Sequence, residues 1–187
     1  MVSLRTQHAS WARRRWIQHP SVLSQFAARP RPVDSSSGPR LFVTLGTIKP
    51  YRFDSLVDAV LATGLANEST VWQLGETTRS DLPGTVRTLT SDDEFRRYAT
   101  EADVVVTHSG VGTILNLLEW GIHPVVVPRR RARGEHVDDH QSQIAALLGD
   151  LGIAVVAEAP DLVHGDLVFA ARHENLERTP PPAQSAR

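Results

Sequence analysis

Short apolar runs alternate along this chain with segments whose apolar residues recur at helical spacing. The apolar runs predict strands over residues 41–45, 70–74, 86–89, 103–107, 124–127 and 153–156. The intervening segments predict helices over residues 53–65, 91–100, 112–120, 137–148 and 161–173. This alternation predicts an α/β fold, a Rossmann-like parallel sheet with helices on both faces.

Two local signals sharpen this prediction. Ser91 is followed three residues later by Glu94, which is the pattern of a capping box at a helix start. Residues 103–107 (DVVVT) are apolar and β-branched, which is typical of a strand buried on both faces. Because open α/β sheets bind ligands beyond the carboxyl ends of their strands, we expect the functional residues directly after strands.

Composition changes along the chain and predicts three parts. Residues 1–39 read as a basic arm followed by a Pro/Ser-rich linker, residues 40–176 as the main domain, and residues 177–187 as a disordered tail. The arm carries Trp11 and Trp16 around three arginines, which would suit either packing onto the domain or a membrane interface. Trp72 and Trp120 are expected to be packing residues.

The totals exclude several function classes. The chain has 187 residues with 41% hydrophobic residues and a net charge of −1, which predicts a globular domain without the charge imbalance of a nucleic-acid binder. The absence of cysteine excludes disulfides, zinc–thiolate sites and cysteine nucleophiles. No apolar run reaches the ~18 residues that a membrane-spanning helix needs. We therefore expect any membrane contact to be peripheral or through a partner, and the absence of cysteine is compatible with a cytoplasmic protein.

The strongest chemical signal is residues 108–113 (HSGVGT), between a buried strand and a helix. Its polar and glycine residues are His108, Ser109, Gly110, Gly112 and Thr113. Glycines allow close approach to a ligand, and the helix start offers free N–H groups that suit a diphosphate. Glu119 lies two turns further along the helix, ~10 Å away, where its carboxylate could accept hydrogen bonds from ribose. An ordinary tight turn with a surface glutamate has the same pattern.

A second cluster, residues 134–141 (GEHVDDHQ), follows the strand at 124–127 and opens a helix. Its candidate ligand-binding residues are His136, Asp139, His140 and Gln141. Together they could hydrogen-bond sugar hydroxyls and an amide. Two histidines four residues apart could also bind metal, but the metalloprotease pattern requires glutamate where Val137 stands. An acidic helix cap with solvated histidines remains the simpler alternative.

Two further segments carry weaker signals. Gly46 and Thr47 end the first strand, with Lys49 nearby, and this turn could face either the donor phosphates or the acceptor. The arginine run over residues 129–133 could line a diphosphate or lipid-phosphate site, or form a solvated loop. No aromatic stacking platform accompanies the run, which argues against nucleic acid.

In this order, the motifs FVTLGT, HSGVGT and GEHVDDHQ, with Glu119, Gly121, Pro124 and Pro128 between the last two, resemble the glycosyltransferase family 28 C-terminal domain. The resemblance covers about residues 40–158 and is strongest to stand-alone donor-binding subunits. Such subunits belong to two-part UDP-sugar transferases of dolichol- or undecaprenyl-linked glycan and exopolysaccharide synthesis. The resemblance implies the C-terminal half of a GT-B glycosyltransferase.

The resemblance also implies roles for the candidate residues. The diphosphate would be held by Ser109, Gly110, Gly112 and Thr113. Glu119 would bind ribose, and His108 and His136 would belong to the same UDP-sugar site. Asp139, His140 and Gln141 would contact sugar or phosphate, and Gly46 and Thr47 would line the cleft.

By this resemblance the chain is the donor-binding subunit of an inverting hexosyltransferase. The donor would be UDP-N-acetylglucosamine or a related UDP-hexose or UDP-uronate, without a cofactor or metal. A membrane-associated partner subunit would supply the catalytic base and the lipid-linked acceptor. The arm resembles the end of that partner in fused enzymes, although Pro20 and residues 23–25 depart from the pattern.

Three other functions stay open. A UDP-N-acetylglucosamine epimerase uses a similar fold and serine–glycine turn, but normally with both domains in one chain. A non-catalytic nucleotide-binding module could simply stabilise a partner. A dinucleotide oxidoreductase fits poorly, because the first strand–helix turn lacks Gly-x-Gly-x-x-Gly.

Overall fold

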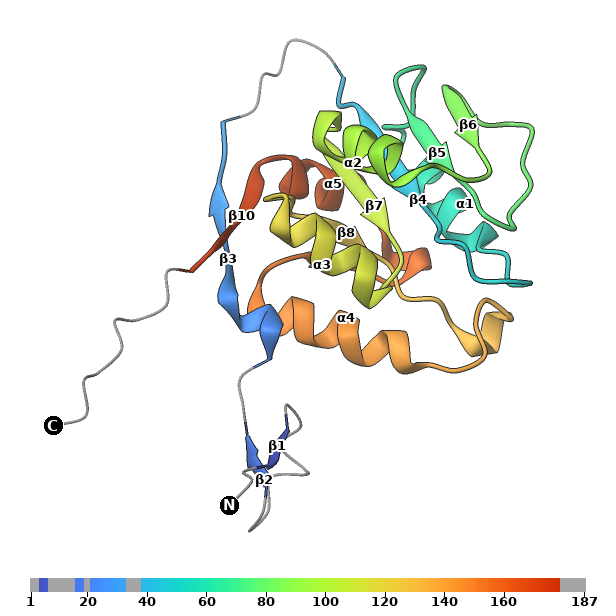
Figure 1. The fold of residues 1–187 in the computed structure, drawn as a ribbon. Helices are drawn as coiled ribbons and strands as arrows, with labels where there is room; N and C mark the ends of the chain where they lie inside the picture. The colour runs from blue at the N-terminus through green and yellow to red at the C-terminus, as the bar shows by residue number, and fades with distance from the viewer. Residues whose placement is uncertain (1–3, 7–15, 19–20, 33–37, 179–187) are drawn as a thin grey trace, which may run out of the picture.

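The computed structural model describes residues 4–6, 16–18, 21–32 and 38–178. Its centre is a six-stranded, wholly parallel sheet with the strand order β6-β5-β4-β7-β8-β9 (Figure 1). The strands are β4 (Leu41–Thr44), β5 (Val71–Gln73), β6 (Thr85–Arg87), β7 (Val104–Thr107), β8 (Val125–Val126) and β9 (Val155–Val156). The predicted Rossmann-like parallel sheet is confirmed.

Helices cover both faces of this sheet, as the alternating pattern predicts (Figure 1). They are α1 (Asp54–Ala62), α2 (Asp92–Glu101), α3 (Val111–Glu119), α4 (His140–Leu151) and α5 (His164–Ala171). Along β7, Val104 and Val106 pack in the core layer of α1 and α5, while Val105 packs in the layer of α2 and α3. The run at 103–107 is therefore a strand buried on both faces, as expected.

The start of α2 has the predicted capping box. The Ser91 hydroxyl accepts a hydrogen bond from the Glu94 N–H at 3.3 Å, and the Glu94 carboxylate accepts one from the Ser91 N–H at 3.0 Å. Trp72 is fully buried and donates its indole N–H to the Pro83 carbonyl at 2.8 Å. Trp120 packs against the core cluster of α2 and α3, so both tryptophans are packing residues.

The expected linker after residue 26 is wrong in its first part. Residues Phe26–Pro30 form strand β3, which pairs antiparallel with β10, His173–Glu177. The last predicted helix is correspondingly shorter, because α5 ends at Ala171. The pairing joins segments almost 150 residues apart, and no local sequence pattern signals so distant a partner.

The segment just before β3 also belongs to the fold. The 3₁₀ helix η2 (Val22–Gln25) and the start of β3 bury Leu23 and Phe26 against the core cluster of α3 and α4. A further short parallel pair, β1 (Leu4–Thr6) and β2 (Trp16–Gln18), precedes them. Trp11 and residues 179–187 of the expected tail lie outside the described residues.

The strand order creates a switch point between β4 and β7. The chain runs outward from β4 to β5 and β6, then crosses to β7 and continues through β8 and β9 on the other side. Loops leaving neighbouring strands at such a point diverge, which leaves a crevice at the carboxyl edge of the sheet.

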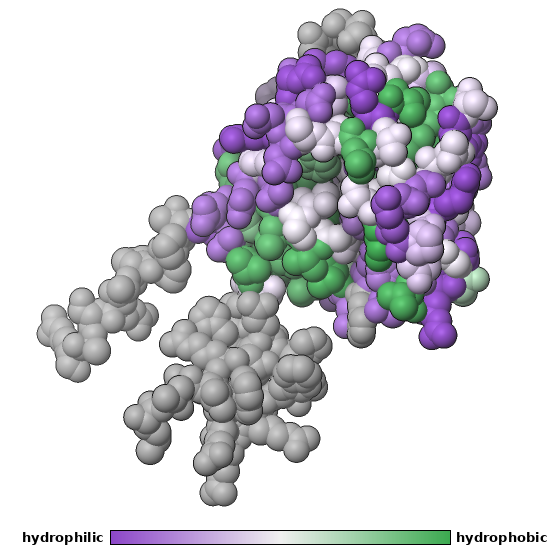
Figure 2. Space-filling view, turned by 45° about the vertical axis from the view of Figure 1, so that its right-hand side comes forward, coloured by the Kyte–Doolittle hydropathy of each residue, from purple (hydrophilic) through white to green (hydrophobic). Residues whose placement is uncertain are grey.

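No helix within the described part of the chain is long and apolar enough to span a membrane. Figure 2 shows hydrophilic and hydrophobic residues interspersed over one face.

Candidate functional site

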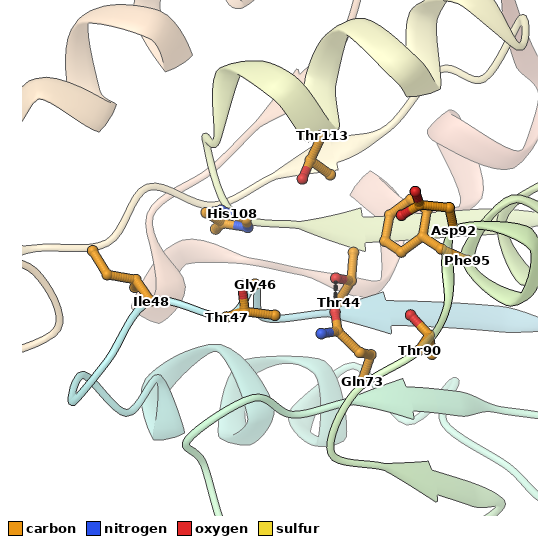
Figure 3. A pocket seen from close by; sticks show the side chains of 10 residues that line it. All are labelled: Thr44, Gly46, Thr47, Ile48, Gln73, Thr90, Asp92, Phe95, His108 and Thr113. Atoms are coloured by element: carbon orange, nitrogen blue, oxygen red, sulfur yellow. Dashed lines mark hydrogen bonds between the residues drawn. The ribbon is translucent and has the colours of Figure 1, made fainter.

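A pocket of about 380 Å³ opens at this switch point, between the carboxyl ends of β4 and β7 (Figure 3). Its walls come from the loops after β4 and β7, from the end of β5, and from the first turns of α2 and α3. The lining residues are Thr44, Gly46, Thr47, Ile48, Gln73, Thr90, Asp92, Phe95, His108 and Thr113. Of the residues predicted from the sequence, the pocket brings together Gly46, Thr47, His108 and Thr113.

Two glycines enclose the imidazole of His108. A Cβ atom on Gly46 would lie 2.6 Å from His108 Cε1, and a Cβ atom on Gly110 would collide with His108 Nε2. Gly46 also has a backbone φ of +77°, which residues with a side chain rarely adopt. Gly75 packs so closely on the Gly46 carbonyl that it too has no room for a side chain. Gly46 and Gly110 therefore both leave space for the His108 ring.

The enclosed imidazole is neutral at physiological pH. Burial, followed by the nearby positive charge of Arg129 and by His136, lowers the pKa of His108 to about 3. Its Nδ1 atom is buried and has no hydrogen-bond partner among the described residues. His108 can therefore donate or accept a hydrogen bond at the pocket without adding a charge.

The turn that leads into α3 presents further unpaired groups. The hydroxyls of Thr107 and Ser109 are buried and have no partner among the described residues. The N-cap residue Gly110 offers no side chain to the first N–H groups of α3. Neither Thr107 nor Ser109 is among the residues that line the pocket, whereas the free N–H groups at the start of α3 suit a ligand with oxygen acceptors.

The opposite wall of the pocket contains residues that the sequence reasoning missed. Gln73 ends β5 and accepts a hydrogen bond from the Thr44 hydroxyl, shown as a dashed line in Figure 3. Thr90, Asp92 and Phe95 come from the start of α2. The rule that ligands bind after strand ends could have found Gln73. No motif marks the other three residues.

The remaining residues predicted on α3 lie outside the pocket lining. Gly112 is exposed, and a Cβ atom there would meet no atom within 4 Å. Glu119 is exposed and is the last residue of the helix, whereas Thr113 points into the pocket from the first turn (Figure 3). The ribose role of Glu119 stays a prediction.

The 134–141 segment forms a hydrogen-bonded loop and the first two residues of α4. The Gln141 side chain is buried and its oxygen accepts from the Arg129 N–H at 3.1 Å, while Asp139 accepts from the Arg131 N–H at 3.0 Å. The His136 ring stacks on Tyr51 with the ring centroids 6.1 Å apart. His140 begins α4, and its side chain lies outside what the structure describes. The sugar contacts expected of this segment stay predictions.

The arginine run is a solvated loop in only part of its length, since residues 131–133 are exposed and Arg129 is buried. Arg129 is 1% exposed and lies under the loops, not in solvent or along the pocket wall. Arg130 and Arg133 form ion pairs with Glu158, and Arg133 also pairs with Glu135. The apolar β8 strand and Pro128 carry the chain into the interior just before Arg129, which explains its burial.

Among the described residues, no group of three or more His, Cys, Asp or Glu side chains could hold a metal.

Comparison with known proteins agrees with this architecture. The model of the glycosyltransferase family 28 C-terminal domain matches residues 43–179. A UDP-N-acetylglucosamine–N-acetylmuramyl-(pentapeptide) pyrophosphoryl-undecaprenol N-acetylglucosamine transferase from Burkholderia cenocepacia is 39% identical over 71 residues, which are 38% of this chain and 18% of the relative. Its counterpart from Paraburkholderia xenovorans is 34% identical over 96 residues, 51% of this chain and 24% of the relative. The chain thus spans less than a quarter of these relatives.

Two solved structures show weaker likeness. The glycotransferase of kitacinnamycin has a TM-score of 0.48 and 20% identity, covering 74% of this chain and 37% of that chain. The glycosyltransferase SnogD from Streptomyces nogalater has a TM-score of 0.43 and 24% identity, covering 75% and 37%.

Proposed function

We propose that this chain, which belongs to the glycosyltransferase family 28 C-terminal domain family, binds the UDP-sugar donor of an inverting hexosyltransferase. The observation that carries the proposal is the pocket at the β4–β7 switch point, which Thr113 lines from the uncapped first turn of α3, with the unpartnered Ser109 hydroxyl buried in the turn just before that helix. Both features offer hydrogen-bond donors that the protein itself leaves unused. A nucleoside diphosphate supplies the missing acceptors.

The diphosphate belongs at the α3 end of the pocket. The partial positive charge of the helix start and the Thr113 hydroxyl, which lines the pocket, favour an anion there, and we assign the Ser109 hydroxyl in the preceding turn to the same anion. At the opposite wall, the carboxylate of Asp92 would repel phosphate. The start of α3 and its hydroxyl groups would also stabilise the negative charge that develops on the departing UDP. The arrangement therefore orients the donor as well as binding it.

The sugar belongs near the 134–141 loop. The His136 ring stacks on Tyr51, which belongs to the same loop as the pocket residues Thr47 and Ile48, so this segment lies near the pocket. We assign Asp139, His140 and Gln141 to sugar or phosphate contacts and Glu119 to ribose. The relatives are named as N-acetylglucosamine transferases, which favours UDP-N-acetylglucosamine among the UDP-hexoses and UDP-uronates that the site could take.

The acceptor side belongs to a partner. The relatives are more than four times longer than the segments they share with this chain, so an acceptor-binding half is to be expected elsewhere. We infer a membrane-associated partner subunit that presents a lipid-linked acceptor at the cytoplasmic face. Its base would deprotonate the acceptor hydroxyl, the oxygen would displace UDP at the anomeric carbon, and the configuration would invert.

Calorimetric titration of the chain with UDP, UDP-N-acetylglucosamine, UDP-glucuronate and NAD tests the donor site. We expect saturable binding of the uridine ligands and none of NAD. Ser109→Ala and Glu119→Ala should each weaken UDP binding at least ~10-fold, or ~1.4 kcal/mol. The control is Ser80→Ala, since Ser80 is an exposed loop residue that does not line the pocket. A folded chain that binds no uridine ligand would contradict the proposal and favour a non-catalytic module.

A further inference from the structure

Arg129 is a buried cation that joins two loops at the carboxyl edge of the sheet. It follows β8, and its side chain reaches under the loop between β4 and α1, residues 45–53. Its Nη2 donates to the Leu45 carbonyl at 2.6 Å, and its Nη1 to the Tyr51 and Arg52 carbonyls at 3.3 and 3.1 Å. The guanidinium therefore holds the first and the last part of the same loop.

Further contacts fix Arg129 itself in place. Nη1 also donates to the Glu135 carbonyl at 2.9 Å, and the guanidinium lies 4.6 Å from the centre of the Phe53 ring. The main-chain N–H donates to the Gln141 side chain at 3.1 Å. Arg129 therefore links the 45–53 loop to Glu135 and to the start of α4. We call this arrangement the Arg129 brace.

Only arginine has the geometry for this set of contacts. Its planar guanidinium carries donors in a fixed fork, so that separate nitrogens reach Leu45 on one side and Tyr51 and Arg52 on the other. Lysine would present all its donors from a single atom. Burial lowers the pKa of Arg129 to about 10, which leaves the side chain charged at neutral pH. Burying a charge is costly, and an apolar side chain would leave the carbonyls unpaired.

We propose that Arg129 is a positioning residue for the donor pocket. The loop whose two ends it holds supplies Gly46, Thr47 and Ile48 to the pocket lining, and Gly46 in turn packs against His108. Fixing Leu45 at one end and Tyr51 at the other fixes the path between them. The expected effect on affinity rests on the proposed donor-binding function, whereas the expected effect on loop mobility does not.

The test compares Arg129→Lys and Arg129→Met with the wild-type chain by amide hydrogen exchange and by titration with UDP. Arg172→Met is the matched control, because Arg172 is an exposed arginine after α5. In both Arg129 variants, peptides covering residues 45–53 should exchange at least ~10-fold faster, while peptides of α2 keep their protection. UDP affinity should fall at least ~10-fold in both (~1.4 kcal/mol), because charge alone cannot replace the fork.

The outcomes separate the two proposals. Unchanged exchange over residues 45–53 in a folded Arg129 variant would overturn the brace. Faster exchange with UDP affinity within twofold of wild type would overturn the role of Arg129 in positioning the donor pocket. If Arg129→Met does not fold, Arg129→Lys decides, since it keeps the aliphatic stem and the charge. If the wild-type chain does not bind UDP, the donor-binding function fails, and the exchange measurement still tests the brace.

Discussion

At the scale of single residues, the position of the His108 ring depends on what its neighbours lack. Gly46 and Gly110 come from the ends of different strands, and each leaves empty the space that the imidazole fills. Gly110 has an ordinary φ of −74°, so its backbone would accept any residue. The need for glycine at this position is therefore a matter of space and not of backbone conformation.

A pair of alanine substitutions tests this reading. Gly110→Ala would force the new methyl group into the His108 ring and should lower the free energy of unfolding by about 1–3 kcal/mol. Gly112→Ala, two residues further along, meets no atom within 4 Å and lies inside α3, so it should raise stability by about 0.5–1 kcal/mol. Chemical denaturation measures both. Equal effects of the two variants would show that crowding at His108 is not the cause.

The buried His108 imidazole predicts a dependence of stability on pH. Its pKa is lowered to about 3 in the folded chain, whereas an unfolded histidine has a pKa of about 6.5. Between these values the unfolded chain binds the proton and the folded chain does not, so stability falls as pH falls. The share of His108 is up to ~1.4 kcal/mol per pH unit.

Denaturation curves between pH 7.5 and 5 measure this share. We expect the His108→Gln variant to lose about 2 kcal/mol less than the wild type over this interval, because glutamine does not titrate. His164→Gln provides the comparison, since His164 is exposed. A wild-type slope preserved in His108→Gln would mean that other groups, such as the buried His123, cause the pH dependence.

At the scale of elements, η2 and β3 add a structural unit that composition alone hides. The surrounding residues are rich in proline, serine and arginine, yet Phe26 is 2% exposed and packs in the same cluster as α3 and α4. Composition averages over a segment, whereas burial depends on one or two side chains within it. The fold therefore begins well before the first strand of the main sheet.

Truncation of Phe26 tests whether this segment stabilises the domain. Phe26→Ala should lower the free energy of unfolding by about 3–5 kcal/mol, because it empties a buried site next to α4. Val22→Ala in the adjacent η2 should change it by less than about 0.5 kcal/mol, because Val22 is 43% exposed. Thermal and urea unfolding measure both. A Phe26→Ala variant as stable as Val22→Ala would mean that the segment docks without supporting the core.

Element boundaries show where local pattern stops being sufficient. The predicted helix at 137–148 begins at His140 in the structure, because the residues before it form a turn in which Gly134 has a φ of +68° and Asp139 caps the Arg131 N–H. The capping box at Ser91 is predicted correctly, since both of its partners lie within four residues. Local signals predict hydrogen bonds between near neighbours, whereas the Asp139 side chain accepts from Arg131, eight residues earlier in the chain.

At the scale of the whole molecule, the sequence alone predicts the strands and helices of the central sheet and the carboxyl edge at which the pocket lies. Apolar periodicity predicts the central elements. The motif at 108–113 predicts the pocket residues His108 and Thr113, and the turn after the first predicted strand predicts Gly46 and Thr47. The rest depends on three-dimensional neighbours. Asp92 and Phe95 reach the pocket because α2 begins beside it, and Arg129 is buried because another loop covers it.

The β3–β10 ribbon gives the domain a direction of mechanical weakness. Phe26 pairs with Glu177 and Pro30 with His173, so the chain enters β3 and leaves β10 at the same end of the ribbon. A pull that separates the preceding segment from the following one would load the hydrogen bonds of this ladder one after another, as in a zipper, rather than all at once. The parallel sheet, enclosed between its helices, would be shielded from that load until the ribbon had opened.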